Sequence, residues 1–165
     1  MDINQFLTYL ESYGLTIMFI VVMLEYLNLP GLPAGVIMPA TGIIIAKGEH
    51  NFLLALVISV IAGTIGSFML YLIGYYGGNP ILDKFSSKYK RMGKAIEKIN
   101  KINDKYGSKY NFIARLIPMA RTLVSLTSGI LRYNPIKFLL YSIPGIAIWN
   151  FAFIYAGYAF SNSFI

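Results

Sequence analysis

The chain has 165 residues, enough for one domain; 56% are hydrophobic and only 13% are charged. Soluble domains carry about 25% charged residues, so this composition and a mean hydropathy of +0.61 indicate an integral membrane protein. The absence of cysteine excludes disulfides and thiol catalysis, and the single histidine, His50, cannot make a zinc site or a serine–histidine relay. We therefore expect no metal, no other cofactor and no enzymatic activity.

The first apolar segment, 15–29, reaches about 20 residues when it is extended back to Tyr9, which is enough to cross a bilayer. No cleavage site of the signal-peptide type follows it, so it is expected to remain in the protein. Segment 30–46 is equally apolar, but prolines and glycines interrupt it. The residues expected to shape it are Pro30, Pro33 and Gly42. Broken backbone at membrane depth must be covered by protein or line a cavity, which predicts a re-entrant hairpin.

Segment 52–78 is the clearest membrane-spanning helix. Its small residues recur at three- and four-residue spacing, which suits close helix packing in lipid. They are Ala62, Gly63, Gly66 and Ser67.

Segment 83–109 holds nine of the fourteen basic residues and only three acids, and so carries +6 of the net charge of +7. Apolar residues every three or four positions predict one amphipathic helix. It either packs on the protein in the cytoplasm or lies on the anionic inner leaflet, and one helix can do both. Nucleic acid is not expected as a partner. The positive-inside rule places this segment in the cytoplasm.

Segment 112–131 is the second interrupted apolar stretch, with Pro118 midway between Arg115 and Arg121. It is expected to form a second re-entrant hairpin, shaped by Pro118 and Gly129. A last span follows at 138–160, where Pro144 is a potential kink.

The two halves of the chain echo each other. Each hairpin ends in a Gly-Ile pair, at Gly42 and Gly129; a Phe-Leu-Leu follows within ten residues, and each spanning helix ends in Gly-Tyr. With the basic segment in the cytoplasm, one hairpin enters from outside and the other from inside. Inverted repeats with broken helices are typical of transporters, whose site lies where the hairpins meet.

Two arginines in an apolar segment would cost about 2.5–3.5 kcal/mol each at the membrane centre. Arginine offers a planar fork to phosphate, and a helix that begins after Pro118 would direct its positive end to the same place. Arg115 and Arg121 thus predict an anion site for a lipid phosphate, although snorkelling to the interface is the alternative. Glu25 is either a proton carrier, a counter-charge for an arginine, or an interfacial carboxylate.

Thr122, Trp149 and Asn150 are candidates to line this site. Packing also explains Trp149, and a hydrogen bond between helices also explains Asn150.

"FIARLIPMARTLVSLTSGIL" resembles the second hairpin of the DedA family of bacterial membrane proteins, also called the SNARE-associated or VTT-domain family. Its pattern there is roughly Phe-x-x-Arg-x-x-Pro-x-x-Arg-Thr followed by small-Gly. "EYLNLPGLPAGVIMPATG", "GSFMLYLIGYYGG" and "GIAIWNFAFIYAGYAF" are similar to the first hairpin and the two spanning helices. The likeness covers about residues 10–160, as a single domain of two halves, about 10–78 and 112–160, joined by the basic helix.

This resemblance implies transport of polyprenyl phosphates such as undecaprenyl phosphate, or of phospholipids such as phosphatidylethanolamine, as a flippase or scramblase in the bacterial cell membrane. Proton coupling is suggested for part of the family. Two departures matter: Gly35 stands where many members carry an acid, and many members continue into one more helix. A partner chain is expected to take the place of the contacts that this further helix makes in those members. The alternatives are a proton-coupled exchanger of ions or solutes and a non-transporting membrane organiser.

Overall fold

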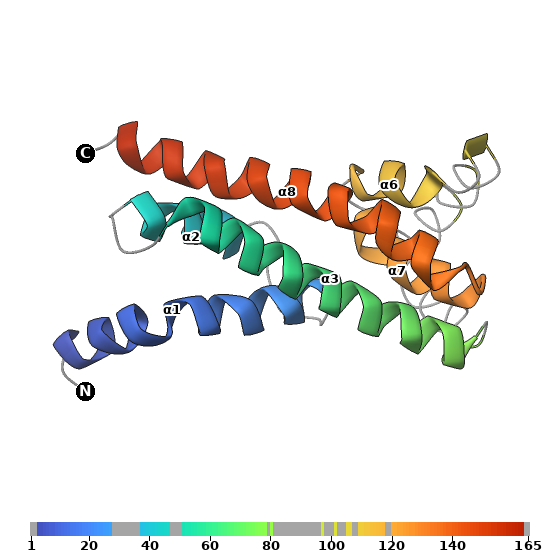
Figure 1. The fold of residues 1–165 in the computed structure, drawn as a ribbon, viewed down its shortest axis with the longest axis horizontal. Coiled ribbons are helices and arrows are strands. Elements are labelled where there is room, and N and C mark those ends of the chain that lie inside the picture. Colours follow the sequence, from blue (N-terminus) through green and yellow to red (C-terminus); the bar gives the residue numbers. More distant parts are fainter. Residues whose placement is uncertain are drawn as a thin grey trace.

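The computed structural model describes residues 3–27, 37–46, 51–78, 109–117 and 120–163, together with the single positions 80, 97, 101, 105 and 106. All regular elements in these ranges are α-helices, as the predicted all-α class requires (Figure 1). They are α1 (Ile3–Tyr26), α2 (Ile37–Ala46), α3 (Phe52–Gly77), α6 (Tyr110–Arg115), α7 (Ala120–Ile130) and α8 (Pro135–Ser163).

The two longest helices, α3 and α8, form the frame of the molecule. Asn51 caps α3, because its side-chain oxygen accepts from the backbone N–H of Leu53 at 2.8 Å. Asn134 caps α8 in the same way, accepting from Ile136 at 3.0 Å, just before Pro135 in the first turn. Both helices are long and apolar enough to cross a membrane, whereas the apolar part of α1 is shorter, Gly14–Tyr26. The helix α8 continues through Pro144.

The two faces of α3 differ in side-chain size. Large apolar residues at four-residue spacing are exposed: Leu53, Val57, Ile61, Ile65, Met69 and Ile73. The small residues predicted to pack are all buried: Ala62, Gly63, Gly66 and Ser67. A long exposed apolar stripe is unfavourable in water and suits contact with lipid. The exposed and buried faces therefore agree with a membrane protein.

In two helix pairs the backbones meet through a glycine on each helix. The helix α2 packs on the C-terminal half of α8, where a Cβ atom on Gly42 would overlap the carbonyl oxygen of Ile154 and one on Gly157 that of Pro39. The helix α7 packs on the C-terminal half of α3 in the same manner, through Gly129 of α7 and Gly74 of α3. These four glycines are the ones that the sequence repeat singled out. Gly42 and Gly129 lie inside helices, where they allow close contact.

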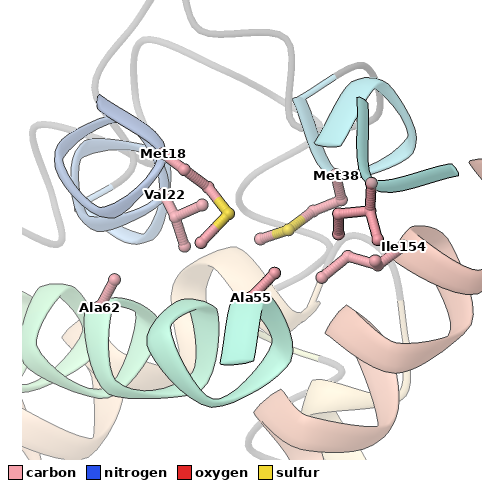
Figure 2. Close-up of a cluster of buried hydrophobic side chains, with 7 residues drawn as sticks. Met18, Val22, Met38, Ala55, Ala62 and Ile154 are labelled. Atoms are coloured by element: carbon pink, nitrogen blue, oxygen red, sulfur yellow. The ribbon is translucent and has the colours of Figure 1, made fainter. Parts of the chain in front are cut away.

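The α2–α8 contact and the α3–α7 contact lie at opposite ends of the molecule (Figure 1). The start of α1 and the end of α8 lie at the α2 end, and α6 and α7 lie at the other end. A hydrophobic cluster fills the α2 end, where Met18 and Val22 of α1 point toward Met38 of α2 and Ile154 of α8 (Figure 2). Tyr110, Ala114, Ala120, Leu123 and Val124 form a second cluster between α6 and α7. The polar residues described next lie between α1, α3, α6, α7 and α8.

Several expectations fall outside the described residues. These are the shaping residues Pro30 and Pro33, position Gly35, Pro118, His50, the side chain of Thr122 and most of the basic segment 83–109. Within that segment the structure describes an exposed ion pair, in which the Lys101 Nζ lies 2.8 Å from Glu97 Oε1. This i, i+4 spacing is that of one helix face.

Candidate functional site: two shielded arginines between five helices

The two arginines lie on separate helices. The helix that holds Arg115 ends at that residue, and the helix that holds Arg121 begins at Ala120. Arg115 is the last residue of α6, and Leu116 and Ile117 form the turn that follows it. Arg121 is the second residue of α7, and its backbone N–H donates to the carbonyl oxygen of Ile117 at 2.9 Å. The interruption predicted around Pro118 is therefore present in the described residues on both sides of it.

Arg115 is buried, with 2% of its surface exposed. Its Nη1 donates to Ser67 Oγ of α3 at 3.2 Å, and its Nη2 donates to Ser125 Oγ of α7 at 3.0 Å. The guanidinium carbon lies 5.5 Å from the ring centre of Phe138. Gly145 of α8 makes room for the aliphatic stem, since a Cβ atom there would lie 3.1 Å from the Arg115 Cβ. The helices thus close around the cation from several sides.

The partners of Arg115 are neutral. No ion pair to Arg115 occurs in the described part of the chain, and its buried Nε there has no hydrogen-bond partner. A buried charge is normally paired or strongly hydrogen-bonded, because leaving water is costly for an ion. Two serine hydroxyls satisfy part of the donor set and leave the positive charge unmatched.

Arg121, in contrast, has an acidic partner. Its Nη2 lies 3.2 Å from Oε1 of Glu25, across 96 positions of sequence. Both side chains are largely shielded, with 9% and 2% of their surface exposed. The guanidinium carbon also lies 4.7 Å from the ring centre of Trp149 and 5.7 Å from that of Tyr26. Of the three interpretations of Glu25, the structure contains the pairing with an arginine.

Tyr26 belongs to a second polar group beside this ion pair. Its hydroxyl donates to Asn150 Oδ1 at 2.7 Å, and Asn150 Nδ2 donates to Ser59 Oγ at 3.1 Å. These are hydrogen bonds between helices, and they join α1, α3 and α8. Gly63 allows the Tyr26 ring to approach α3, because a Cβ atom there would lie 3.0 Å from the Tyr26 Cε2.

The two arginines share one region of the protein. Ser125, which binds Arg115, follows Arg121 by four residues on α7 and so lies one turn away on the same face. The other hydrogen-bond partner of Arg115, Ser67, is next to Gly66 in α3, and the Cβ of Tyr26 packs against Gly66. Among the described residues, the hydrogen bonds, the ion pair and the ring contacts of both arginines come from α1, α3, α7 and α8.

Sequence reasoning brought Glu25, Arg115, Arg121, Trp149 and Asn150 to this region, but it missed Tyr26, Ser59 and Ser125. Ser67 was recognised only as a small packing residue. A serine among glycines and alanines on a spanning helix is equally a packing residue and a hydrogen-bond donor or acceptor. Only the position of Arg115, which donates to Ser67, shows that this serine is a hydrogen-bond acceptor as well as a packing residue.

These features define an all-helical membrane protein with a buried cationic centre at the break between two helices. A model of the VTT domain matches residues 29–159. The chain therefore belongs to the VTT-domain family, also known as the DedA family. The resemblance seen in the hairpin motif is thereby confirmed.

Curated relatives are similar over most of the chain. A Bacillus subtilis protein named undecaprenyl phosphate transporter A is 33% identical over 156 residues, which cover 94% of this chain and 76% of the relative. Its Staphylococcus aureus namesake is 31% identical over 160 residues, which cover 94% and 78%. Protein DedA of Escherichia coli K12 is 28% identical over 114 residues, which cover 69% and 52%. No solved structure matches the chain.

Proposed function

We propose that this protein is a membrane transporter of phosphate-bearing lipids, acting as a flippase or scramblase, and that Arg115 and Arg121 bind the phosphate. The observation that carries the proposal is the buried Arg115 guanidinium, whose described partners are two neutral hydroxyls. An anion that binds there would supply the missing counter-charge, and guanidinium matches phosphate oxygens in geometry.

Undecaprenyl phosphate or another polyprenyl phosphate is the preferred substrate, and a phospholipid such as phosphatidylethanolamine is the other candidate. The names of the two relatives above 30% identity support the polyprenyl phosphate. A phosphate on an apolar chain also suits a cationic centre enclosed by helices whose outer faces are apolar. The proposed activity is movement of an intact lipid, with no bond made or broken.

The proposed architecture is an inverted repeat of two re-entrant hairpins, in a multi-pass protein of the bacterial cell membrane. The matching glycine contacts support it, since Gly42 meets α8 as Gly129 meets α3. The basic segment 83–109 would then lie in the cytoplasm, on the anionic inner leaflet. Alternating access would come from movement of one half against the other about the arginines. An oligomer is compatible with this arrangement.

Glu25 has two candidate roles in this transporter, that of a proton carrier and that of a counter-charge for the empty site. The ion pair with Arg121 supports the second role. It is also compatible with the first, because a buried carboxylate that leaves its cation is stabilised by taking up a proton.

Reconstitution in liposomes tests the proposal. Flipping of a polyprenyl phosphate and of phosphatidylethanolamine would be measured with and without a pH gradient, for wild type, Arg115→Gln and Arg121→Gln. Arg132→Gln is the matched control, because Arg132 is an exposed arginine whose cation faces the ring of Tyr75. We expect flipping to fall by at least tenfold in both site variants and to persist in the control.

The other functional classes have distinct outcomes in the same assay. Proton-driven movement of ions without lipid flipping would favour an exchanger. Folded wild-type protein that moves neither lipids nor ions would favour a non-transporting organiser. Equal flipping by wild type and both site variants would remove the arginines from the mechanism.

A further inference from the structure

Arg115 and Arg121 differ in one respect that bears on how a phosphate enters the site. Arg115 is held by two serine hydroxyls and has no anionic partner among the described residues. Arg121 is already engaged by the carboxylate of Glu25. A phosphate that uses both guanidinium groups therefore meets one cation without an acidic partner among the described residues and one that is already paired with a carboxylate.

We infer that Glu25 takes the place of a phosphate oxygen on Arg121, so that the substrate binds Arg115 and completes its site by displacing the carboxylate. The inference rests on the proposed function and concerns how that site is loaded. Arg115 is then the permanent anchor, and Arg121 is a second anchor that becomes available when Glu25 leaves it.

The contact between Glu25 and Arg121 has the form of an exchangeable bond. It joins one oxygen to one nitrogen at 3.2 Å, longer than the 2.7–2.9 Å usual for a charge-assisted hydrogen bond. The second carboxylate oxygen, Oε2, is buried and has no hydrogen-bond partner in the described part of the chain. A phosphate can engage the guanidinium through two parallel bonds, which the carboxylate does not do here.

The aromatic neighbours keep Arg121 in place when Glu25 leaves. Trp149 lies 4.7 Å and Tyr26 5.7 Å from the guanidinium carbon, measured to the ring centres. Tyr26 is fixed in turn by its hydrogen bond to Asn150. The carboxylate can therefore be exchanged for another anion while the cation stays in position.

The charges of the site indicate the class of phosphate. With Glu25 on Arg121, two cations and one carboxylate leave a single positive charge. With Glu25 displaced and its buried carboxylate protonated, two positive charges face the ligand. A phosphate monoester carries about −1.5 to −2 at neutral pH and matches the second state, whereas a phosphodiester carries one negative charge and matches the first. Displacement of Glu25 thus selects a lipid with a terminal phosphate.

Direct binding tests this inference separately from transport. A short-chain prenyl monophosphate would be titrated into purified protein in detergent, for wild type, Glu25→Gln and Arg121→Gln. The matched control is Glu11→Gln, which removes a carboxylate from the same helix. We expect Glu25→Gln to bind at least tenfold more tightly than wild type, since it frees Arg121 from a charged partner. Arg121→Gln should bind at least tenfold more weakly, and Glu11→Gln should equal wild type.

Three further probes define the ligand class. The corresponding prenol, inorganic phosphate and phosphatidylethanolamine are each expected to bind wild type at least tenfold more weakly than the prenyl monophosphate. Equal binding of inorganic phosphate would overturn the assignment to a lipid, and equal binding of phosphatidylethanolamine would overturn the preference for a terminal phosphate.

Because Glu25→Gln leaves Arg121 buried without its partner, folding is checked by thermal unfolding. The variant should be less stable than wild type without ligand and should gain more stability from the prenyl monophosphate. Glu25→Asp keeps the charge on a shorter side chain, and we expect about threefold tighter binding. Unchanged or weaker binding of the prenyl monophosphate in folded Glu25 variants would overturn the inference that the phosphate and the Glu25 carboxylate compete for Arg121. Loss of binding in wild type itself would instead remove the proposed function.

Discussion

Substitution of the four packing glycines by alanine tests the paired helix contacts that frame the site. A Cβ atom on Gly129 would lie 2.7 Å from the Tyr75 backbone nitrogen and 2.9 Å from the Tyr71 carbonyl carbon. Favourable contacts need about 3.5–4.0 Å, and the Tyr71 carbonyl oxygen lies closer still, so α7 must move from α3 by at least about 1 Å. Overpacking of this kind costs about 1–3 kcal/mol. For a chain of this size that is a loss of about 2–12 °C in Tm.

The double substitutions are the sharper part of this experiment. Gly42→Ala and Gly157→Ala act on the same contact, so the second costs little once the first has separated α2 from α8. Gly42→Ala and Gly129→Ala act on contacts at opposite ends of the molecule, so their effects should add within about 0.5 kcal/mol.

Thermal unfolding in detergent, followed by loss of the monodisperse peak, measures both combinations. The control is Ala156→Val, at an exposed position of α8 next to Gly157; it should leave the Tm within about 2 °C. Full additivity of Gly42→Ala with Gly157→Ala would refute the pairing, as would an unchanged Tm in all four single variants.

Three further predictions concern the polar centre and the helix caps. Arg115→Lys keeps the charge but cannot bridge Ser67 and Ser125 as the guanidinium does, so flipping of polyprenyl phosphate in liposomes should fall by at least tenfold; retention of full activity would show that charge alone suffices. Tyr26→Phe removes the hydroxyl bonded to Asn150 and should lower stability by about 1 kcal/mol, or about 2–4 °C in Tm, while its ring stays beside Arg121; a Tm equal to that of wild type would contradict the hydrogen bond. Asn51→Ala removes the cap of α3 and should cost about 1 kcal/mol, seen as a Tm lower by about 2–4 °C, and the exposed variant Ala152→Ser serves as its control.

Much of this protein follows from local sequence. Apolar length predicts the long helices, because a bilayer demands about 20 apolar residues for each span. Pro118 predicts the break between Arg115 and Arg121, because a proline inside a helix removes a backbone hydrogen bond and clashes with the preceding turn. The second-hairpin motif and three further similar segments led to the correct family. These features depend on residue type and on spacing within one segment.

The pairing of side chains across helices was decided by the tertiary structure. Glu25 and Arg121 are 96 positions apart, and Arg115 reaches Ser67 across 48. Periodicity shows which residues share a face of one helix, but it does not fix the rotation of that helix against its neighbours. The same holds for the glycines, which the sequence repeat identified, while their partners in α8 and α3 emerged only from packing.

The sequence by itself therefore determined that this is a helical membrane protein of the VTT-domain family with two arginines beside a helix break. The tertiary structure alone decided that these arginines are unequal. One is surrounded by hydroxyls and the other is matched by a carboxylate. The physical reason is that a buried charge is stabilised by the side chains that lie within about 3 Å of it, and the packing of the helices decides which side chains those are.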